Sequence, residues 1–477
     1  MTATLSEAPP ATAPARGTTG RQRLVLVVLL AAQFMLAVDF SILNVALPVI
    51  GQGLGFSLGN LQWIATSFAL CAAGFTLLFG RVADLLGRRR VFLTGLAVLA
   101  VASLAGGLAT GPEVLLAARV AQGLATAAVT PAGLALLTTA FPEGPLRDRA
   151  LGLNGALMSA GFTSGAVLGG LLTDLLSWRW AFFVNVPVAL AVLLVAPRLI
   201  AESRPRPATG GGREGGRGRM DLPGAVTVTG GLLALVYGLT TAGERGWGYP
   251  PALVALVAAA LLLTAFWFVE RSAAAPLVPV RVLRRRTVVW GNAAGLLAFA
   301  TETSLVFLLT LYLQRVLGFS PLATGLAFGV LGAGTVLGGV VAPRLIGRLG
   351  SRGALLAGFL VQAVATASLV LLGADRAWLG LLLAATFVGG VGNMLAIVGF
   401  MVTATSGLPD DEQGLATGVA TMTQQVGITL GTPVMSAVAT AAAAGTTVLT
   451  GVGWAIAVNT ALVLLAGAAS ALFLRRR

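Results

Sequence analysis

Three ionisable residues lie inside long apolar stretches of the chain: Asp39, Arg119 and Glu302. An unpaired charge at the middle of a bilayer costs about 2.5 to 3.5 kcal/mol on insertion scales, so such residues usually face a cavity or a charged partner. The sequence contains no histidine, so proton transfer near neutral pH would fall to carboxyl groups. We therefore expect these three residues to take part in proton coupling or substrate binding.

The three residues are expected at a similar depth. With a rise of about 1.5 Å per residue, Asp39 and Glu302 each lie about 21 Å from the inner ends of their helices, and Arg119 lies about 9 Å below the outer surface. An ion pair between Asp39 and Arg119 is therefore geometrically possible, and protonation of the acid would break it. The alternatives are that Asp39 is hydrated near the interface, that Arg119 extends outward along its stem, and that Glu302 is only structural.

Uncharged polar residues and glycines mark further helices. The segment GFTSGAVLGG (residues 161–170) has a small-xxx-small spacing that lets helices approach closely. Its glycines are Gly161, Gly165, Gly169 and Gly170. Asn393, Gln424 and Gln425 could line a wide cavity for amphipathic ligands or join helices by hydrogen bonds, and both interpretations stay open.

The composition is that of an integral membrane protein. Of the 477 residues, 57% are hydrophobic and 10% are charged, and the mean hydropathy is +0.91. The apolar runs are about 19 to 27 residues long, as helices that cross a hydrocarbon core of about 30 Å require. The sequence shows no alternating ten-residue segments of the kind that form β-barrels. We predict an all-α membrane protein with about fourteen transmembrane helices.

The arginines orient these helices, which begin near residues 24, 60, 91, 113, 148, 181, 222, 251, 288, 322, 353, 378, 413 and 450. All 31 basic residues are arginine, and most fall in alternate loops and in the two tails, as cytoplasmic segments would. Both termini are therefore predicted to be cytoplasmic. The net charge of +14 then reflects membrane orientation and not nucleic-acid binding.

The predicted organisation has two six-helix halves separated by an extra pair of helices. Its segments are a disordered cytoplasmic tail (1–23), the first half (24–200), a Gly/Arg linker (201–221), the two extra helices (222–270), a basic loop (271–287), the second half (288–474) and the C-terminus (475–477).

An internal repeat supports the two halves. At an offset of 263 residues, GRVADLLGRRR (80–90) aligns with PRLIGRLGSR (343–352), and Asp39 aligns with Glu302. The arginines and glycines of the two loops coincide at three positions: Arg81 with Arg344, Gly87 with Gly350, and Arg89 with Arg352. Repeated halves are typical of transporters that bind substrate at the interface between the repeats.

With these motifs in view, the chain resembles the major facilitator superfamily, and within it the fourteen-helix drug:proton antiporters. The resemblance covers nearly the whole chain. GRVADLLGRRR is similar to the loop signature of the superfamily, except at Val82 and Leu85, and RVAQG (119–123) is similar to its helix-four motif. DFSILNVALP (39–48) and WRWAFFVNVP (178–187) resemble motifs of the fourteen-helix exporters. The glycine series resembles the antiporter motif, although Ala166 stands where that motif has proline.

The resemblance implies roles for particular residues. Arg119 would modulate the protonation of Asp39, which would carry a proton or meet a cationic substrate, and Gln122 belongs to the same helix-four motif. Asp84 would latch the cytoplasmic side by meeting the start of a helix in the other half. The implied latch also includes Gly80, Arg81, Gly87, Arg88 and Arg89.

The leading functional prediction is proton-coupled efflux of small amphipathic drugs or antibiotics across a bacterial cytoplasmic membrane, by a chain that acts as a monomer. A metabolite importer or facilitator on the same fold and a non-transporting membrane sensor are the alternatives. The sequence contains no HExxH, CxxC, GxSxG or P-loop pattern and only one cysteine, Cys71. We therefore expect no enzyme activity, no metal and no cofactor, with the proton gradient as the energy source.

Overall fold

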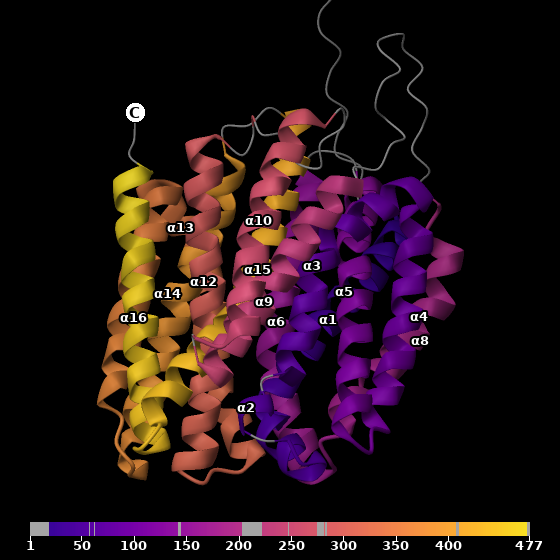
Figure 1. Cartoon of the computed structure of the whole chain (residues 1–477). Coiled ribbons are helices and arrows are strands. Elements are labelled where there is room, and N and C mark those ends of the chain that lie inside the picture. The colour runs from indigo at the N-terminus through magenta and orange to yellow at the C-terminus, as the bar shows by residue number, and fades with distance from the viewer. Residues whose placement is uncertain are drawn as a thin grey trace, which may run out of the picture.

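The structure is a computed structural model of the chain, and it describes residues 19–56, 58–61, 63–141, 145–202, 222–246, 248–273, 281, 284–406 and 410–474. Within these ranges all regular secondary structure is helical. The helices run side by side in one bundle (Figure 1). The predicted tail, the Gly/Arg linker and the last three arginines fall mostly or wholly outside the described residues.

The first part of the chain forms α1 (Gly20–Leu54), α2 (Leu58–Leu61), α3 (Trp63–Leu86), α4 (Arg88–Gly107), α5 (Pro112–Ala140), α6 (Pro145–Leu175), α7 (Trp180–Phe183) and α8 (Asn185–Leu199). The central pair is α9 (Leu222–Arg245) and α10 (Pro250–Ser272). The last part forms α12 (Arg286–Leu311), the π-helical turn η1 (Tyr312–Val316), α13 (Pro321–Ser368), the 3₁₀ turns η2 (Leu369–Leu371) and η3 (Arg376–Trp378), α14 (Leu379–Thr405), α15 (Asp410–Ala443) and α16 (Val448–Phe473).

Eleven helical segments of the described chain are long and apolar enough to cross a membrane. One of them, Pro321–Leu371, holds two predicted spans, because α13 consists of two helices joined at a kink. At the kink Gly350 has φ 73°, a left-handed conformation that glycine adopts without steric cost. Two more predicted spans coincide with α3 and α6. The structure is thus compatible with the predicted number of crossings.

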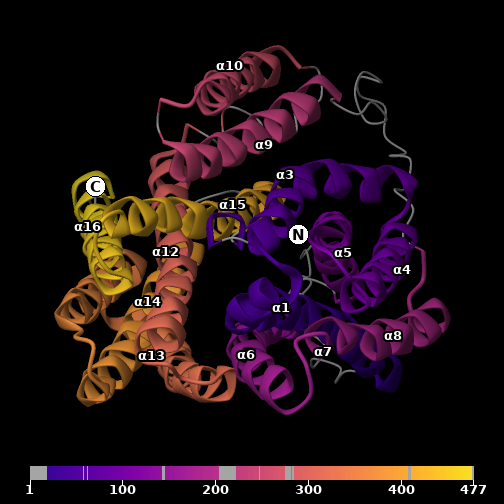
Figure 2. The same cartoon turned by 60° about the horizontal axis from the view of Figure 1, so that its bottom comes forward.

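The bundle has two groups of helices with the central pair along one side (Figure 2). Helices α1 to α8 gather in one group and α12 to α16 in the other. Helix α9 packs against α3 and α15, and α10 packs on α9. The central pair therefore flanks the place where the two groups meet.

Glycines let α6 touch the backbone of α1. A Cβ atom at Gly169 would lie 2.2 Å from the carbonyl oxygen of Ile42, so no larger residue fits without moving a helix. Gly161 and Gly165 meet backbone oxygens of α1 in the same way, at 2.9 and 2.8 Å. The antiporter-like glycine series is therefore a helix-packing surface.

The same packing recurs in the second group, between α15 and α12. A Cβ atom at Gly427 would lie 2.5 Å from the carbonyl oxygen of Leu296, and one at Gly431 would lie 2.1 Å from that of Ala300. The two glycines are again four residues apart, one helical turn.

Two pairs of helices carry the contact between the groups. Helix α6 crosses α13 at Gly170 and Gly325. A Cβ atom added at Gly170 would lie 2.4 Å from the Pro321 carbonyl oxygen, and one added at Gly325 would lie 2.8 Å from that of Ala166. Helix α15 meets α3 through a hydrogen bond of 2.9 Å from the Thr429 hydroxyl to the Ala69 carbonyl.

The largest hydrophobic cluster that the two groups share lies toward one end of the bundle. One large cluster draws on both groups; it includes Val45, Phe182, Leu309, Phe328 and Ile456. Toward the end that carries the C-terminus each group has its own cluster, the first with Leu29, Phe92 and Leu136 and the second with Phe359, Phe400 and Leu474.

The substitution Gly169→Ala tests the close α1–α6 contact. We expect it to destabilise the folded protein by about 1 to 3 kcal/mol, because the added methyl group overlaps a backbone oxygen that cannot rotate away. The matched control is Gly453→Ala in α16, where an added Cβ meets nothing within 4 Å. Thermal unfolding in detergent measures both, and equal melting temperatures would contradict the assigned packing.

Candidate functional site

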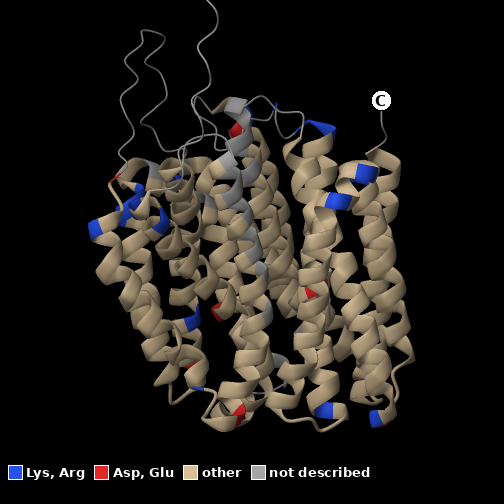
Figure 3. Ribbon diagram, turned by 180° about the vertical axis from the view of Figure 1, so that it is seen from behind, with Lys and Arg blue, Asp and Glu red and all other residues tan. Residues whose placement is uncertain are grey.

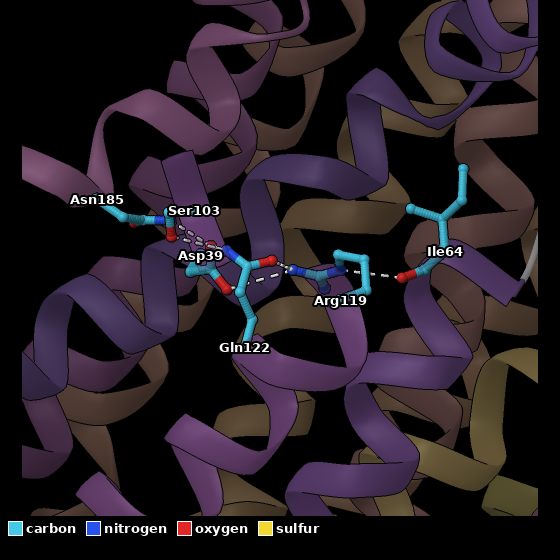
Figure 4. A network of polar contacts seen from close by, with 6 residues as sticks. All are labelled: Asp39, Ile64, Ser103, Arg119, Gln122 and Asn185. Carbon is cyan, nitrogen blue, oxygen red and sulfur yellow. Dashed lines mark hydrogen bonds and ion pairs between the residues drawn. The ribbon is translucent and has the colours of Figure 1, made fainter. Parts of the chain in front are cut away.

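An ion pair is buried in the first group of helices. Asp39 of α1 and Arg119 of α5 are 0% and 1% exposed, and Nη1 of Arg119 lies 3.4 Å from Oδ2 of Asp39. The structure thus brings together the two charges that the sequence places at similar depth (Figure 4). In this conformation Asp39 is fully buried, and Arg119 reaches inward to it.

Gln122 joins the pair to a third helix. Its Nε2 donates to Oδ1 of Asp39 at 3.1 Å and to the hydroxyl of Ser103 on α4 at 2.9 Å. Its Oε1 accepts from Nη1 of Arg119 at 2.9 Å. Arg119 and Gln122 are three residues apart on α5 and so share one face of the helix, which explains the spacing of the RVAQG motif.

Asn185, the first residue of α8, completes the surroundings of the carboxylate. Its Nδ2 donates to Oδ1 of Asp39 and, at 3.4 Å, to the hydroxyl of Ser103. Four helices, α1, α4, α5 and α8, thus each contribute at least one side chain to the network around this carboxylate (Figure 4).

The guanidinium group is held from its other side by α3. Nε of Arg119 donates to the carbonyl oxygen of Ile64 at 3.0 Å, and its Cζ lies 4.1 Å from the centre of the Phe68 ring. A planar guanidinium group suits this combination, because it can bond in its plane and stack on an aromatic face at once.

The environment of Asp39 consists of hydrogen-bond donors. Arg119, Gln122 and Asn185 all donate to its two oxygens, and an ionised carboxylate can accept about four such bonds. Removing one member of a buried pair leaves an uncompensated charge and costs about 3 to 5 kcal/mol. In this conformation the carboxylate is therefore held by three donors, although Oδ1 of Asn185 is buried and has no partner among the described residues.

Glu302 of α12 does not belong to this network. It lines a separate cavity of about 20 Å³ between α12, α13 and α14, which is room for about one water molecule. No hydrogen bond or ion pair joins Glu302 to another of the described residues. Gln362, Thr366 and Asn393 line the same cavity.

The cavity around Glu302 contains buried side-chain oxygens that have no hydrogen-bond partner. The amide of Asn393 donates to the Ala298 carbonyl at 3.2 Å, and that of Gln362 donates to the Thr301 hydroxyl at 3.2 Å. These bonds fix both amide orientations. The remaining oxygens, Oδ1 of Asn393 and Oε1 of Gln362, are buried and have no partner in the described structure, and the same holds for the Thr366 hydroxyl.

The predicted cavity residues separate into two sets. Asn393 lines the Glu302 cavity, as described above. Gln424 and Gln425 lie half-buried on α15 and do not line it. Whether these three residues line a wide cavity for amphipathic ligands or join helices by hydrogen bonds stays open as a prediction.

The predicted latch residues lie at the turn between α3 and α4. Gly87 has φ 108° and begins the turn. The Arg88 guanidinium donates to the Thr139 hydroxyl of α5 at 2.8 Å, and that of Arg89 donates to the Pro197 carbonyl of α8 at 2.8 Å. These contacts stay within the first group of helices. The side chain of Asp84 lies outside the described part of the structure, and its contact with the other half stays a prediction.

The turn between α3 and α4 is also contacted by a residue that the sequence motifs did not indicate. Glu202, which follows α8, accepts from the backbone N–H of Arg89 at 3.2 Å and lies 3.8 Å from Nε of Arg90. A Cβ atom at Gly87 would lie 2.5 Å from its Oε1. Gly80 lies on the α5 side, where its Cβ would be 3.6 Å from Pro131. Arg81 is half-buried on α3.

Comparison with known proteins agrees with this fold. Residues 29–432 match the sequence profile of the Major Facilitator Superfamily. The chain belongs to this superfamily, so it is a membrane-embedded transporter of small molecules and not an enzyme.

Curated relatives span most of the chain. The cephamycin export protein CmcT of Amycolatopsis lactamdurans is 40% identical over 412 residues, which cover 86% of this chain and 83% of that protein. The puromycin resistance protein pur8 of Streptomyces alboniger is 38% identical over 449 residues, which cover 92% and 86%.

Solved structures share the fold at low sequence identity. The human organic anion transporter MFSD10 (TETRAN) aligns with a TM-score of 0.63 at 19% identity, over 94% of this chain and 99% of that one. The D323A mutant of the nucleoside transporter NupG aligns with a TM-score of 0.64 at 13% identity, over 95% and 100%.

A double-mutant cycle tests the buried pair. Asp39→Asn and Arg119→Gln should each lower the stability of the folded protein by about 3 to 5 kcal/mol, because each leaves one buried charge without its partner. The double variant should lose clearly less than the sum, because it removes both charges. Thermal unfolding in detergent gives the coupling, with the exposed Arg376→Gln as a control. Strictly additive losses would show that the two groups do not interact.

Proposed function

We propose that this protein exports small amphipathic drugs or antibiotics from the bacterial cytoplasm in exchange for protons. Export is supported by the relatives named as export and resistance proteins, whose similarity extends over most of the chain. Proton exchange rests on one observation: the two halves hold carboxyl groups at repeat-equivalent positions, Asp39 and Glu302, in opposite hydrogen-bonding environments.

Under this proposal the chain crosses the cytoplasmic membrane fourteen times, with both termini in the cytoplasm. The helices form six, then two, then six crossings, and one chain is the transporting unit. The distribution of charge supports the orientation, because basic residues gather at the end of the bundle that carries the C-terminus (Figure 3). The shared hydrophobic cluster then closes the outer side.

Glu302 is the proton-carrying group in this proposal. A carboxylate only accepts hydrogen bonds, whereas a neutral carboxyl group also donates one. The cavity offers the unpartnered oxygens of Gln362 and Asn393, which are acceptors. A neutral Glu302 can donate to one of these oxygens, directly or through a water molecule, and relieves part of the cost of their burial.

Asp39 has the complementary role. Its donors suit a carboxylate, and its pairing with Arg119 ties α1 to α5 while the outer side is closed. A cationic compound or a proton that reached Asp39 would compete with Arg119 for it. The hydrogen-bond network of Asp39 therefore reaches the interface between the halves through α1, on which α6 packs.

Transport follows from differential binding. A ligand moves a conformational equilibrium only by as much as its affinities for the two states differ. A proton at Glu302 favours the state in which the acceptors around it are buried, as they are here. Its loss would favour a state in which water or other donors reach the carboxylate, and the exported compound would compete for that second state.

Everted membrane vesicles test the coupling. With an imposed proton gradient, wild-type vesicles should accumulate puromycin or a cationic dye against its gradient. Glu302→Gln should abolish this accumulation, because glutamine cannot exchange a proton, yet it should retain counterflow of the compound, which requires no net proton transfer.

The control is Glu113→Gln, which removes an exposed acid at the start of α5. It should accumulate like wild type. Accumulation by Glu302→Gln at the wild-type level would move the proton site elsewhere. Equilibration without accumulation by wild type would indicate a facilitator, and no movement of any compound would favour the sensor alternative.

A further inference from the structure

A second cavity lies at the end of the bundle that carries the C-terminus. Its volume is about 870 Å³, and residues of α12, α13, α14 and α16 line it. Three arginines reach it: Arg286 at the start of α12, and Arg348 and Arg352 on the two sides of the α13 kink. No acidic side chain is among the described residues that line this cavity.

The arginines around this cavity have few partners of their own. Arg286 makes no side-chain hydrogen bond or ion pair with the described residues. Arg348 likewise makes none within that part of the chain. Arg352 donates through Nη2 to the Ala471 carbonyl at 2.7 Å, but its Nε is buried and without a partner there. Three guanidinium groups around one cavity repel each other unless an anion lies between them.

The internal repeat provides an equivalent turn in the first half, with which the arginines of this cavity can be compared. Arg89 and Arg352 are repeat equivalents, and each donates through Nη2 to a carbonyl in the last turn of a helix, Pro197 of α8 or Ala471 of α16. Each follows a glycine with a left-handed backbone, Gly87 or Gly350. The two turns therefore have the same construction.

The two turns differ in one respect. In the first half a carboxylate of the chain itself, Glu202, caps the start of α4 and approaches the arginines there. In the second half the residues that follow α16 are Arg475, Arg476 and Arg477, whose structure lies outside the described residues. The chain thus supplies an anion after α8 and further cations after α16.

The rim of the cavity is apolar. Leu349 is 47% exposed and Phe473 is 37% exposed. The Phe473 ring stacks on that of Trp290, with 3.9 Å between centroids. Leu356 and Leu474 extend the same surface. A ligand with an anionic group and an attached hydrocarbon chain would match both parts of the cavity.

We propose that this cavity binds the phosphate group of an anionic phospholipid from the cytoplasmic leaflet. The orientation rests on the proposed topology of the transporter. The phosphate takes the place that the Glu202 carboxylate has in the first half: it accepts from Arg286, Arg348 and Arg352 and caps the helix that starts after Gly350. An acyl chain lies along the apolar rim. The lipid thereby ties the ends of α12, α13 and α16 together.

Thermal unfolding of the purified full-length protein in detergent tests this proposal. Short-chain phosphatidylglycerol should raise the melting temperature in a saturable way, because a ligand that binds only the folded state stabilises it. Phosphatidylcholine of the same chain length should not. An equal shift with phosphatidylcholine would overturn an anionic site, and an equal shift with inorganic phosphate would assign it to a free anion.

Variants locate the site. Arg286→Gln combined with Arg348→Gln should raise the half-saturating phosphatidylglycerol concentration about ten-fold or more, because two charge-assisted contacts are lost. Neither side chain has another described contact, so the fold should persist. Arg344→Gln on the same helix is the control, since Arg344 is exposed and lies outside the cavity.

An unchanged half-saturating concentration in the double variant would overturn the proposal. The assay measures binding and requires no transport, so its failure would leave drug export and proton coupling untouched. If phosphatidylglycerol raised the melting temperature of a protein that does not transport, the lipid site would stand while the proposed function failed.

Discussion

The burial of two opposite charges inside an apolar bundle is the constraint on which the first half of this transporter depends. Neither Asp39 nor Arg119 can be buried alone, because an isolated ion loses its hydration without compensation. Each therefore requires the other, and together they require Gln122, Asn185 and Ser103 to satisfy the remaining donors and acceptors. The helices that carry these side chains, together with α3 through the Ile64 carbonyl, are fixed around one polar centre. Glycine packing of α6 on α1 then connects that centre to the interface between the halves.

The repeat has been kept in the backbone and changed in the side chains. Close contacts at glycines one turn apart join α6 to α1 and α15 to α12, and the turns at Gly87 and Gly350 place equivalent arginines on equivalent carbonyls. The halves differ at their ionisable side chains and in the groups that surround them. Asp39 accepts from three donors, Glu302 shares its cavity with unpartnered amide oxygens, and arginines follow α16 where Glu202 follows α8. Under the proposed function, one half of the duplicated scaffold holds a charge and the other exchanges a proton.

Much of the helical architecture could be predicted from the sequence, because apolar runs of membrane length are a strong signal. The contact of Asp39 with Arg119 was also accessible, since helical rise gives depth and unpaired charges in lipid require partners. Ser103 could not be found, because a single serine in an apolar helix is common. Asn185 had a weak signal within WRWAFFVNVP, but it reaches Asp39 across 146 residues of sequence, and no spacing rule covers such a contact. Glu202 lies within the predicted linker (201–221), where it reads as a surface charge. Asn393 lines the Glu302 cavity whereas Gln424 and Gln425 do not, and the sequence could not separate them because a polar residue in a helix does not reveal which face its neighbours cover.

Proton release on ligand binding distinguishes Glu302 from Asp39 as the acid that carries the proton. Purified protein in weakly buffered detergent solution would be mixed with an exported compound, and a pH-indicating dye would report the protons released. We predict release from wild type and from the variant that combines Asp39→Asn with Arg119→Gln, and none from Glu302→Gln. Release from Glu302→Gln together with its loss in the Asp39 variant would contradict the account, and would make the acid of the buried ion pair the proton carrier.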